Sequence, residues 1–234
     1  SVELLLSNGL RYHADNRRSF SVPTVQPVAY STIDYPVPPF MVGLWFATKR
    51  AKNRYAYNAD MFRHIEKKLR GMGYLPLPTK KHLKYPRMEI RPEIKYAFLT
   101  KYPSIPTTIP DEYFIGNSDQ RLELLRGIVW GLPHVYKKAT NKYSYVSVDQ
   151  RFCRKLQGLC ESLGIRTVLS AKNKEHRLTF RTDLPIMPGM PDKTWVGTRE
   201  RRMIASIEEQ PAQPCVHIEA EDTFVVGEGY IAIC

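Results

Sequence analysis

Two stretches of this chain carry apolar residues at three- and four-residue steps, which is the spacing of one face of an α-helix. They span 60–72 and 149–163, and their apolar positions are Phe62, Ile65, Leu69 and Met72, then Phe152, Leu156, Leu159 and Leu163. Asp60 and Asp149 stand where an N-cap is expected. Both stretches therefore predict amphipathic helices that bury one side.

Other segments alternate between polar and apolar positions, the two-residue period of a β-strand. They are 53–57, 84–91, 141–145, 165–171 and 176–182. In the last of these segments Arg177, Thr179 and Arg181 share one side, and a mostly apolar set shares the other. We expect a polar, basic surface opposite a core surface.

The same order of elements occurs twice along the chain. An apolar segment (41–47, then 125–131) precedes an Asn-basic-Tyr-x-Tyr strand, and an amphipathic helix ending in glycine follows. The repeats, at about 39–102 and 117–183, predict an α+β unit used twice around a pseudo-two-fold axis. Gly43 and Gly127 would let a helix from each half approach closely at its centre. Coincidence between two ordinary amphipathic segments is the alternative.

The composition bounds the class of protein. Hydrophobic residues make up 43% of the 234 residues and charged residues 25%, which supports a packed core. No apolar run approaches 18 residues, so no membrane span is expected. The four cysteines form no CxxC pair, which predicts reduced thiols in a cytoplasm and no structural zinc. Cys153 and Cys160, seven residues apart on one predicted helix, are expected in the core.

The charge is distributed unevenly. Lys+Arg 35 against Asp+Glu 23 gives a net charge of +12, of which residues 42–183 carry +16, whereas 1–41 are neutral and 184–234 carry −4. A polyanion is the usual partner of such a basic segment; a basic protein without one is the alternative. Proline-rich stretches at 36–39 and 185–191 predict boundaries between three parts, 1–38, 39–184 and 192–234.

The two apolar segments with their flanks resemble a known family. Residues 39–45, Pro-Phe-Met-Val-Gly-Leu-Trp, and 124–129, Leu-Leu-Arg-Gly-Ile-Val, are similar to the paired helices of a two-repeat LAGLIDADG homing endonuclease. Segments 2–9, 203–209, 215–219 and 223–229 resemble strands of an intein splicing domain. The resemblance implies an α+β fold: a pseudo-two-fold LAGLIDADG-like domain, with a small all-β, intein (Hint)-like module made from the two chain ends.

The chain departs from that family where the chemistry would be. Each LAGLIDADG helix of the family ends in an acidic residue that holds a divalent metal, but the matching positions here are Thr48 and Leu132. No Asp or Glu occurs in 35–59 or in 124–148 to replace them. The intein pattern lacks its first nucleophile, Asn16 stands at the expected histidine, and the chain ends in Cys234 instead of His-Asn. We therefore expect no enzymatic activity, no catalytic residues, no metal site and no cofactor.

The basic residues that remain predict a nucleic-acid-binding surface. Arginine and lysine contact phosphates, and tyrosines can stack on bases, although Tyr55, Tyr57, Tyr143 and Tyr145 are expected in the core. The strands and connecting segments offer a set of candidates. They are Lys49, Arg50, Lys52, Arg54, Tyr85, Arg87, Arg91, Lys137, Lys138, Lys142, Arg166, Lys172, Lys174, Arg177 and Arg181. Ser170 is expected beside Arg166 on the same face.

Three functions follow from these observations. The first is a catalytically inactive descendant of an intein-borne homing endonuclease that binds structured RNA, including ribosomal RNA, or duplex DNA. The second is an active DNA endonuclease with an atypical site. The third is a protein-interaction factor acting through the acidic segment 219–222. We favour the first function, with RNA preferred over DNA as the ligand. We also expect a cytoplasmic monomer of phage-encoded origin that has no membrane partner.

Overall fold

The computed structural model describes residues 21–23, 27–50, 59–74, 77–79, 87–89, 99–102, 104, 108–132, 134–137, 141–188, 201–203, 224–226 and 231–233. Within them, helices and small antiparallel sheets alternate along the chain. The expectation of an α+β fold is confirmed at this level. None of the helices in these ranges has the length and apolar character that a membrane span requires.

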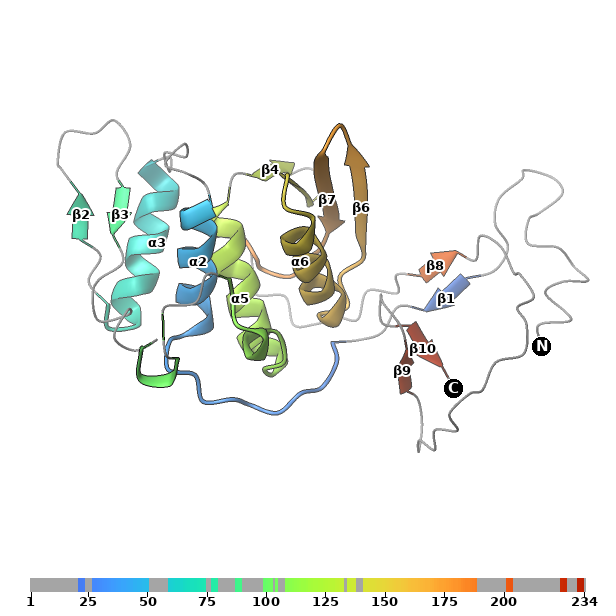
Figure 1. Cartoon of the computed structure of the whole chain (residues 1–234), viewed down its shortest axis with the longest axis horizontal. Helices are drawn as coiled ribbons and strands as arrows, with labels where there is room; N and C mark the ends of the chain where they lie inside the picture. Colours follow the sequence, from blue (N-terminus) through green and yellow to red (C-terminus); the bar gives the residue numbers. More distant parts are fainter. Residues whose placement is uncertain are drawn as a thin grey trace, which may run out of the picture.

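Two helices, α2 (Pro39–Arg50) and α5 (Ser118–Gly131), pack against each other at the centre (Figure 1). A Cβ at Gly43 would lie 2.8 Å from the backbone N of Ile128, and one at Gly127 would lie 2.8 Å from the backbone N of Leu44. Real Cβ atoms do not approach backbone this closely, so only glycine fits at these two positions. The predicted close approach of the two helices is confirmed, and the contact is reciprocal.

The amphipathic segments form α3 (Ala59–Gly71) and α6 (Gln150–Ser162), which flank the central pair in Figure 1. Asp149 caps α6, because its side chain accepts a hydrogen bond from the backbone N of Phe152 at 2.9 Å. The matching prediction for Asp60 is wrong. The helix α3 begins one residue earlier, so Asp60 lies in its first turn, where a carboxylate favours the helix dipole.

A four-stranded antiparallel sheet with the order β4-β5-β7-β6 lies in the second half of the domain. Its strands are β4 (His134–Lys137), β5 (Lys142–Ser147), β6 (Thr167–Lys172) and β7 (Glu175–Arg181). Three of the four match predicted strands, and β4 was not predicted. Asn173 and Lys174 join β6 to β7 with positive φ angles of 50° and 66°, as a two-residue hairpin turn requires.

The remaining ladders are short. In the first half β2 (Leu77–Thr79) pairs with β3 (Arg87–Glu89), and a 3-10 turn, η1 (Asp111–Phe114), precedes α5. Two segments far apart in the sequence also pair, β1 (Ser21–Pro23) with β8 (Arg201–Met203). A hairpin of β9 (Phe224–Val226) and β10 (Ile231–Ile233) lies beside them (Figure 1). The β1–β8 ladder thus joins a segment before the central helices to one after them. The Hint-like module stays a prediction.

The core lies between the helices and one face of the four-stranded sheet. Tyr143 is 1% exposed and Tyr145 6%, so their predicted core role is confirmed. Cys153 and Cys160 are buried as predicted, and burial raises the pKa of the Cys160 thiol above its ordinary value. The predicted strand 53–57, with Tyr55 and Tyr57, lies outside the described residues.

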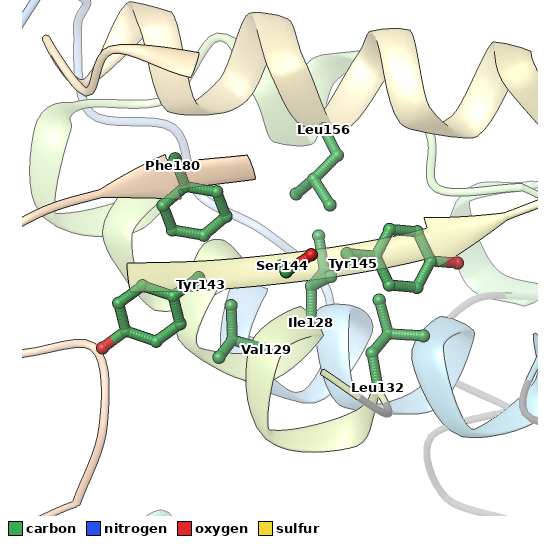
Figure 2. A pocket seen from close by; sticks show the side chains of 8 residues that line it. All are labelled: Ile128, Val129, Leu132, Tyr143, Ser144, Tyr145, Leu156 and Phe180. Atoms are coloured by element: carbon green, nitrogen blue, oxygen red, sulfur yellow. The ribbon is translucent and has the colours of Figure 1, made fainter. Parts of the chain in front are cut away.

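Figure 2 shows a small cavity in this core. Its volume is about 10 Å³, the size of roughly one water molecule. Apolar and aromatic side chains line it: Ile128, Val129, Leu132, Tyr143, Tyr145, Leu156 and Phe180. Ser144 also borders it, but the alternation along β5 directs the Ser144 side chain to the opposite side of the sheet. A cavity of this size and lining is a packing space, not a ligand site.

Candidate nucleic-acid interface

The strand β7 sorts its residues between two environments. Leu178 is fully buried and Phe180 is 3% exposed, whereas Arg177 and Arg181 are exposed. The sequence predicts this alternation, and the structure has it. We call the side of the sheet that carries Arg177 and Arg181 the open face, because α5 and α6 pack on the other side.

The pairing register decides which residues of β5 and β6 join the open face. In an antiparallel sheet directly opposed residues point to the same side. The opposed pairs on the open face are Lys142 with Arg181, Ser144 with Thr179, Val146 with Arg177, Val168 with Thr179 and Ser170 with Arg177. The predicted neighbourhood of Ser170 and the arginines of β7 is thus present.

Three more predicted cations belong to the same region. Lys172 is opposite Glu175 at the end of the sheet, and Lys174 occupies the adjacent turn. Arg166 immediately precedes β6, and continuing the register by one residue sets it opposite Arg181. All three are exposed. The structure therefore gathers six of the predicted residues on or beside one face: Lys142, Arg166, Lys172, Lys174, Arg177 and Arg181.

Several other candidates have a different structural place from the one expected. Lys49 and Arg50 are the last residues of α2 and not part of a connecting segment. Lys137 is the last residue of β4, opposite Lys142, and Lys172 is the last residue of β6. Both were expected in connecting segments, because the local pattern did not reveal the hydrogen-bonded ladders to which they belong. Arg87 begins β3, apart from the four-stranded sheet. The remaining candidates lie outside the described residues: Lys52, Arg54, Tyr85, Arg91 and Lys138.

The ion pairs between described residues all lie away from the open face. None of the six has an ion pair with another residue among those that the structure describes. Elsewhere in the described part of the domain, six Lys and Arg side chains form an ion pair with another described residue. These pairs are Arg63–Asp60, Lys68–Glu123, Arg70–Glu66, Lys101–Glu112, Arg126–Glu123 and Lys155–Asp111.

Few acids offset this charge. On the described part of the open face the strands carry one carboxylate, Glu175. Asp183 lies two residues beyond β7 and accepts a hydrogen bond from the side chain of Asn141 at 2.9 Å. Six cations against these two carboxylates leave the region positively charged, which attracts a polyanion and releases its counterions on binding.

Sequence reasoning placed Thr179 on this face with the two arginines of β7, but it did not single out three other uncharged residues, Ser144, Val146 and Val168. Val146 is 37% exposed and Val168 58%, while Ser144 and Thr179 are half-buried. The two-residue period of β5 and β6 contains the signal, because each of these positions alternates with a core residue. The register is still needed to bring them together.

The positions where the family would hold a metal lie at the C-terminal ends of α2 and α5. A Cβ at Gly131 would lie 2.7 Å from the Cβ of Ala47, so these two ends are neighbours. Thr48 donates its hydroxyl hydrogen bond to the carbonyl of Trp45 at 2.9 Å, and Leu132 is 7% exposed and lines the core cavity of Figure 2. A divalent metal needs oxygen ligands, preferably carboxylates, and these two residues do not fit it.

A cluster of titratable groups with shifted pKa values lies away from the open face, around η1. Burial raises the pKa of Tyr35 to about 12, and its hydroxyl donates to the carbonyl of Glu112 at 2.7 Å. Burial also favours the neutral carboxyl of Glu112, but hydrogen bonds from Tyr102, the backbone and Lys101 outweigh this effect and hold its pKa below the ordinary value. The cluster ties the loop before α5 to the core.

Comparisons with known proteins give structural neighbours only. No protein-family model matches the sequence, and no curated protein does. Mesophilic variants of the homing endonuclease I-DmoI share 9% identity over 62% of this chain and 88% of theirs, with a TM-score of 0.40. The N-terminal LAGLIDADG domain of DUF199/WhiA shares 8% identity over 64% of this chain and 80% of its own, with a TM-score of 0.39.

Proposed function

We propose that this chain binds nucleic acid through the open face of its four-stranded sheet and does not cleave it. The observation that carries the proposal is the set of six cations on or beside one face, none ion-paired within the described residues. Holding like charges together without counterions is unfavourable for the free protein, so a polyanionic ligand accounts for the arrangement. The ligand is structured RNA, such as a segment of ribosomal RNA, or duplex DNA.

The proposed origin is an intein-borne LAGLIDADG homing endonuclease whose cleavage and splicing have been lost. It is supported by the reciprocal glycine contacts of α2 and α5 and by the residues at positions 48 and 132. The ends of the chain would be the remains of the splicing module. A cytoplasmic, monomeric, phage-encoded protein suits this origin.

A salt titration with matched variants tests the binding surface. Arg177→Gln/Arg181→Gln is compared with Arg151→Gln, an exposed arginine on α6, across the sheet from the open face. Affinity for an RNA or DNA duplex is measured by fluorescence anisotropy between 50 and 300 mM salt. Each phosphate contact contributes about one unit to the slope of log K against log salt, so the double variant is expected to lose about two units and R151Q none.

Three outcomes would contradict the proposal. Equal salt slopes for the double variant and the wild type would show that the open face is not the binding surface. Absence of salt-dependent binding to either duplex would favour a protein-interaction role instead. Cleavage of either duplex in the presence of Mg²⁺ would contradict the loss of catalysis and return the endonuclease function.

A further inference from the structure

The open face has a row of short side chains between its cations. Ser144, Thr179 and Val168 lie opposite one another on β5, β7 and β6. We call these three residues the short row. On one side of it lie Lys142 and Arg181, and on the other lies Arg177. A step of two residues along a strand is about 6.6 Å, so Arg177 and Arg181 are about 13 Å apart along β7.

Two hydroxyls of the short row are not used by the fold. Within the described residues neither the Thr179 nor the Ser144 hydroxyl has a hydrogen-bond partner in the protein. Nearby hydroxyls do have one, because Thr167 donates to Glu161 at 2.8 Å and Ser170 donates to the carbonyl of Arg177 at 3.4 Å. A threonine and a serine side by side, half-buried and flanked by arginine, are therefore available to a ligand.

The length of these side chains selects the kind of surface they can touch. Base edges in the major groove of B-DNA lie at the bottom of a groove about 8.5 Å deep, beyond the reach of Ser, Thr or Val on the face of a four-stranded sheet. The minor groove of A-form RNA is wide and shallow, and it presents 2′-hydroxyls at its surface. A ribose hydroxyl can both donate to and accept from a serine or threonine hydroxyl.

We propose that the short row contacts the ribose edge of a double-stranded RNA segment. In this arrangement Thr179 and Ser144 form hydrogen bonds with 2′-hydroxyls, the exposed Val168 packs against a sugar, and arginines on both sides of the row hold phosphates. This inference rests on the proposed function and names its ligand class as RNA. Thr179, together with Ser144, then distinguishes ribose from deoxyribose.

The test compares two duplexes of one sequence, a 20-base-pair RNA and the matching DNA, with fluorescence anisotropy as readout. Wild-type protein is expected to bind the RNA more tightly. Thr179→Val keeps the shape and the strand preference but removes the hydroxyl, so it is expected to weaken RNA binding about three- to tenfold and leave DNA binding unchanged. Thr179→Ser retains the hydroxyl and is expected to keep the RNA preference.

The controls separate this inference from the proposed function. Arg177→Gln is expected to weaken both duplexes alike, because phosphates are common to RNA and DNA. If T179V weakens RNA and DNA equally, or neither, or if the wild type prefers DNA, the ribose contact is refuted while nucleic-acid binding stands. If the wild type binds neither duplex in a salt-dependent way, the proposed function itself fails. Circular dichroism of each variant confirms that the fold is retained.

Discussion

Because α2 and α5 are in close contact, we predict that adding a single methyl group between them destabilises the fold. Gly127→Ala would place a Cβ 2.8 Å from the backbone N of Leu44 and closer still to the carbonyl of Phe40. These are backbone atoms of the facing helix, so they cannot rotate away as a side chain would. The helix pair must move apart, and the buried surface between the two helices is lost.

The magnitude follows from two opposing effects. Overpacking a core costs about 1–3 kcal/mol, and the clash with two backbone atoms places this site at the upper end. Alanine is better than glycine inside a helix by about 1 kcal/mol. The net expectation for G127A is a loss of about 2 kcal/mol in the free energy of unfolding. For a chain of this length that lowers Tm by roughly 4–8 °C.

Gly158 in α6 provides the matched control. It is also inside a helix, but a Cβ there would meet nothing within 4 Å. Gly158→Ala is therefore expected to gain about 0.5–1 kcal/mol from helix propensity alone. Unfolding of both variants is followed by circular dichroism in urea and on heating. If G127A is as stable as G158A, the close helix approach does not exist in solution and the reasoning is refuted.

Two further predictions concern polar side chains that are hydrogen-bonded within the fold. Arg121 is fully buried and donates hydrogen bonds to the carbonyls of Gly116 at 2.8 Å, Ser162 at 2.6 Å and Val28. Because three carbonyls would lose a donor, Arg121→Leu is expected to lower the free energy of unfolding in urea by about 3 kcal/mol or more. An unchanged urea midpoint would contradict this. Tyr102→Phe removes a hydrogen bond that lowers the pKa of Glu112. A carboxyl with a lowered folded-state pKa stabilises the fold above its unfolded pKa near 4.5, and this contribution is lost as the pH falls. The stability difference between wild type and Y102F is therefore expected to be largest near pH 7 and to shrink below about pH 4; a difference that is constant with pH would contradict it.

Local patterns in the sequence determined several elements. The three- and four-residue apolar steps of 60–72 and 149–163 predict α3 and α6, and the alternation of 176–182 predicts β7 with its arginines on one side. Such periods follow from backbone geometry within one element, so a short stretch of sequence contains them. A glycine in each of the two apolar segments also predicted the contact of α2 with α5, because a residue without a Cβ lets two helix backbones approach closely.

Other features depend on residues far apart in the sequence. β4 has no clear alternation and exists as a ladder because β5 is beside it. Arg121 is a charged residue that the sequence does not mark as buried. It is buried in the fold, where the carbonyls of Val28, Gly116 and Ser162 accept its hydrogen bonds. A local sequence pattern predicts neither the pairing of β4 with β5 nor the burial of Arg121, because both depend on distant residues.

The candidate site combines both levels. The sequence by itself determined that residues 42–183 carry a net charge of +16 and that β7 presents arginine on one side. Only the tertiary structure decided that Lys142 and Ser144 of β5 and Val168 of β6 stand beside those arginines. Only the tertiary structure decided, too, that the ion pairs between described residues form elsewhere on the domain. Strand register is set by hydrogen bonds and core packing between distant segments, and it changes which side chains meet without changing the pattern of any one strand.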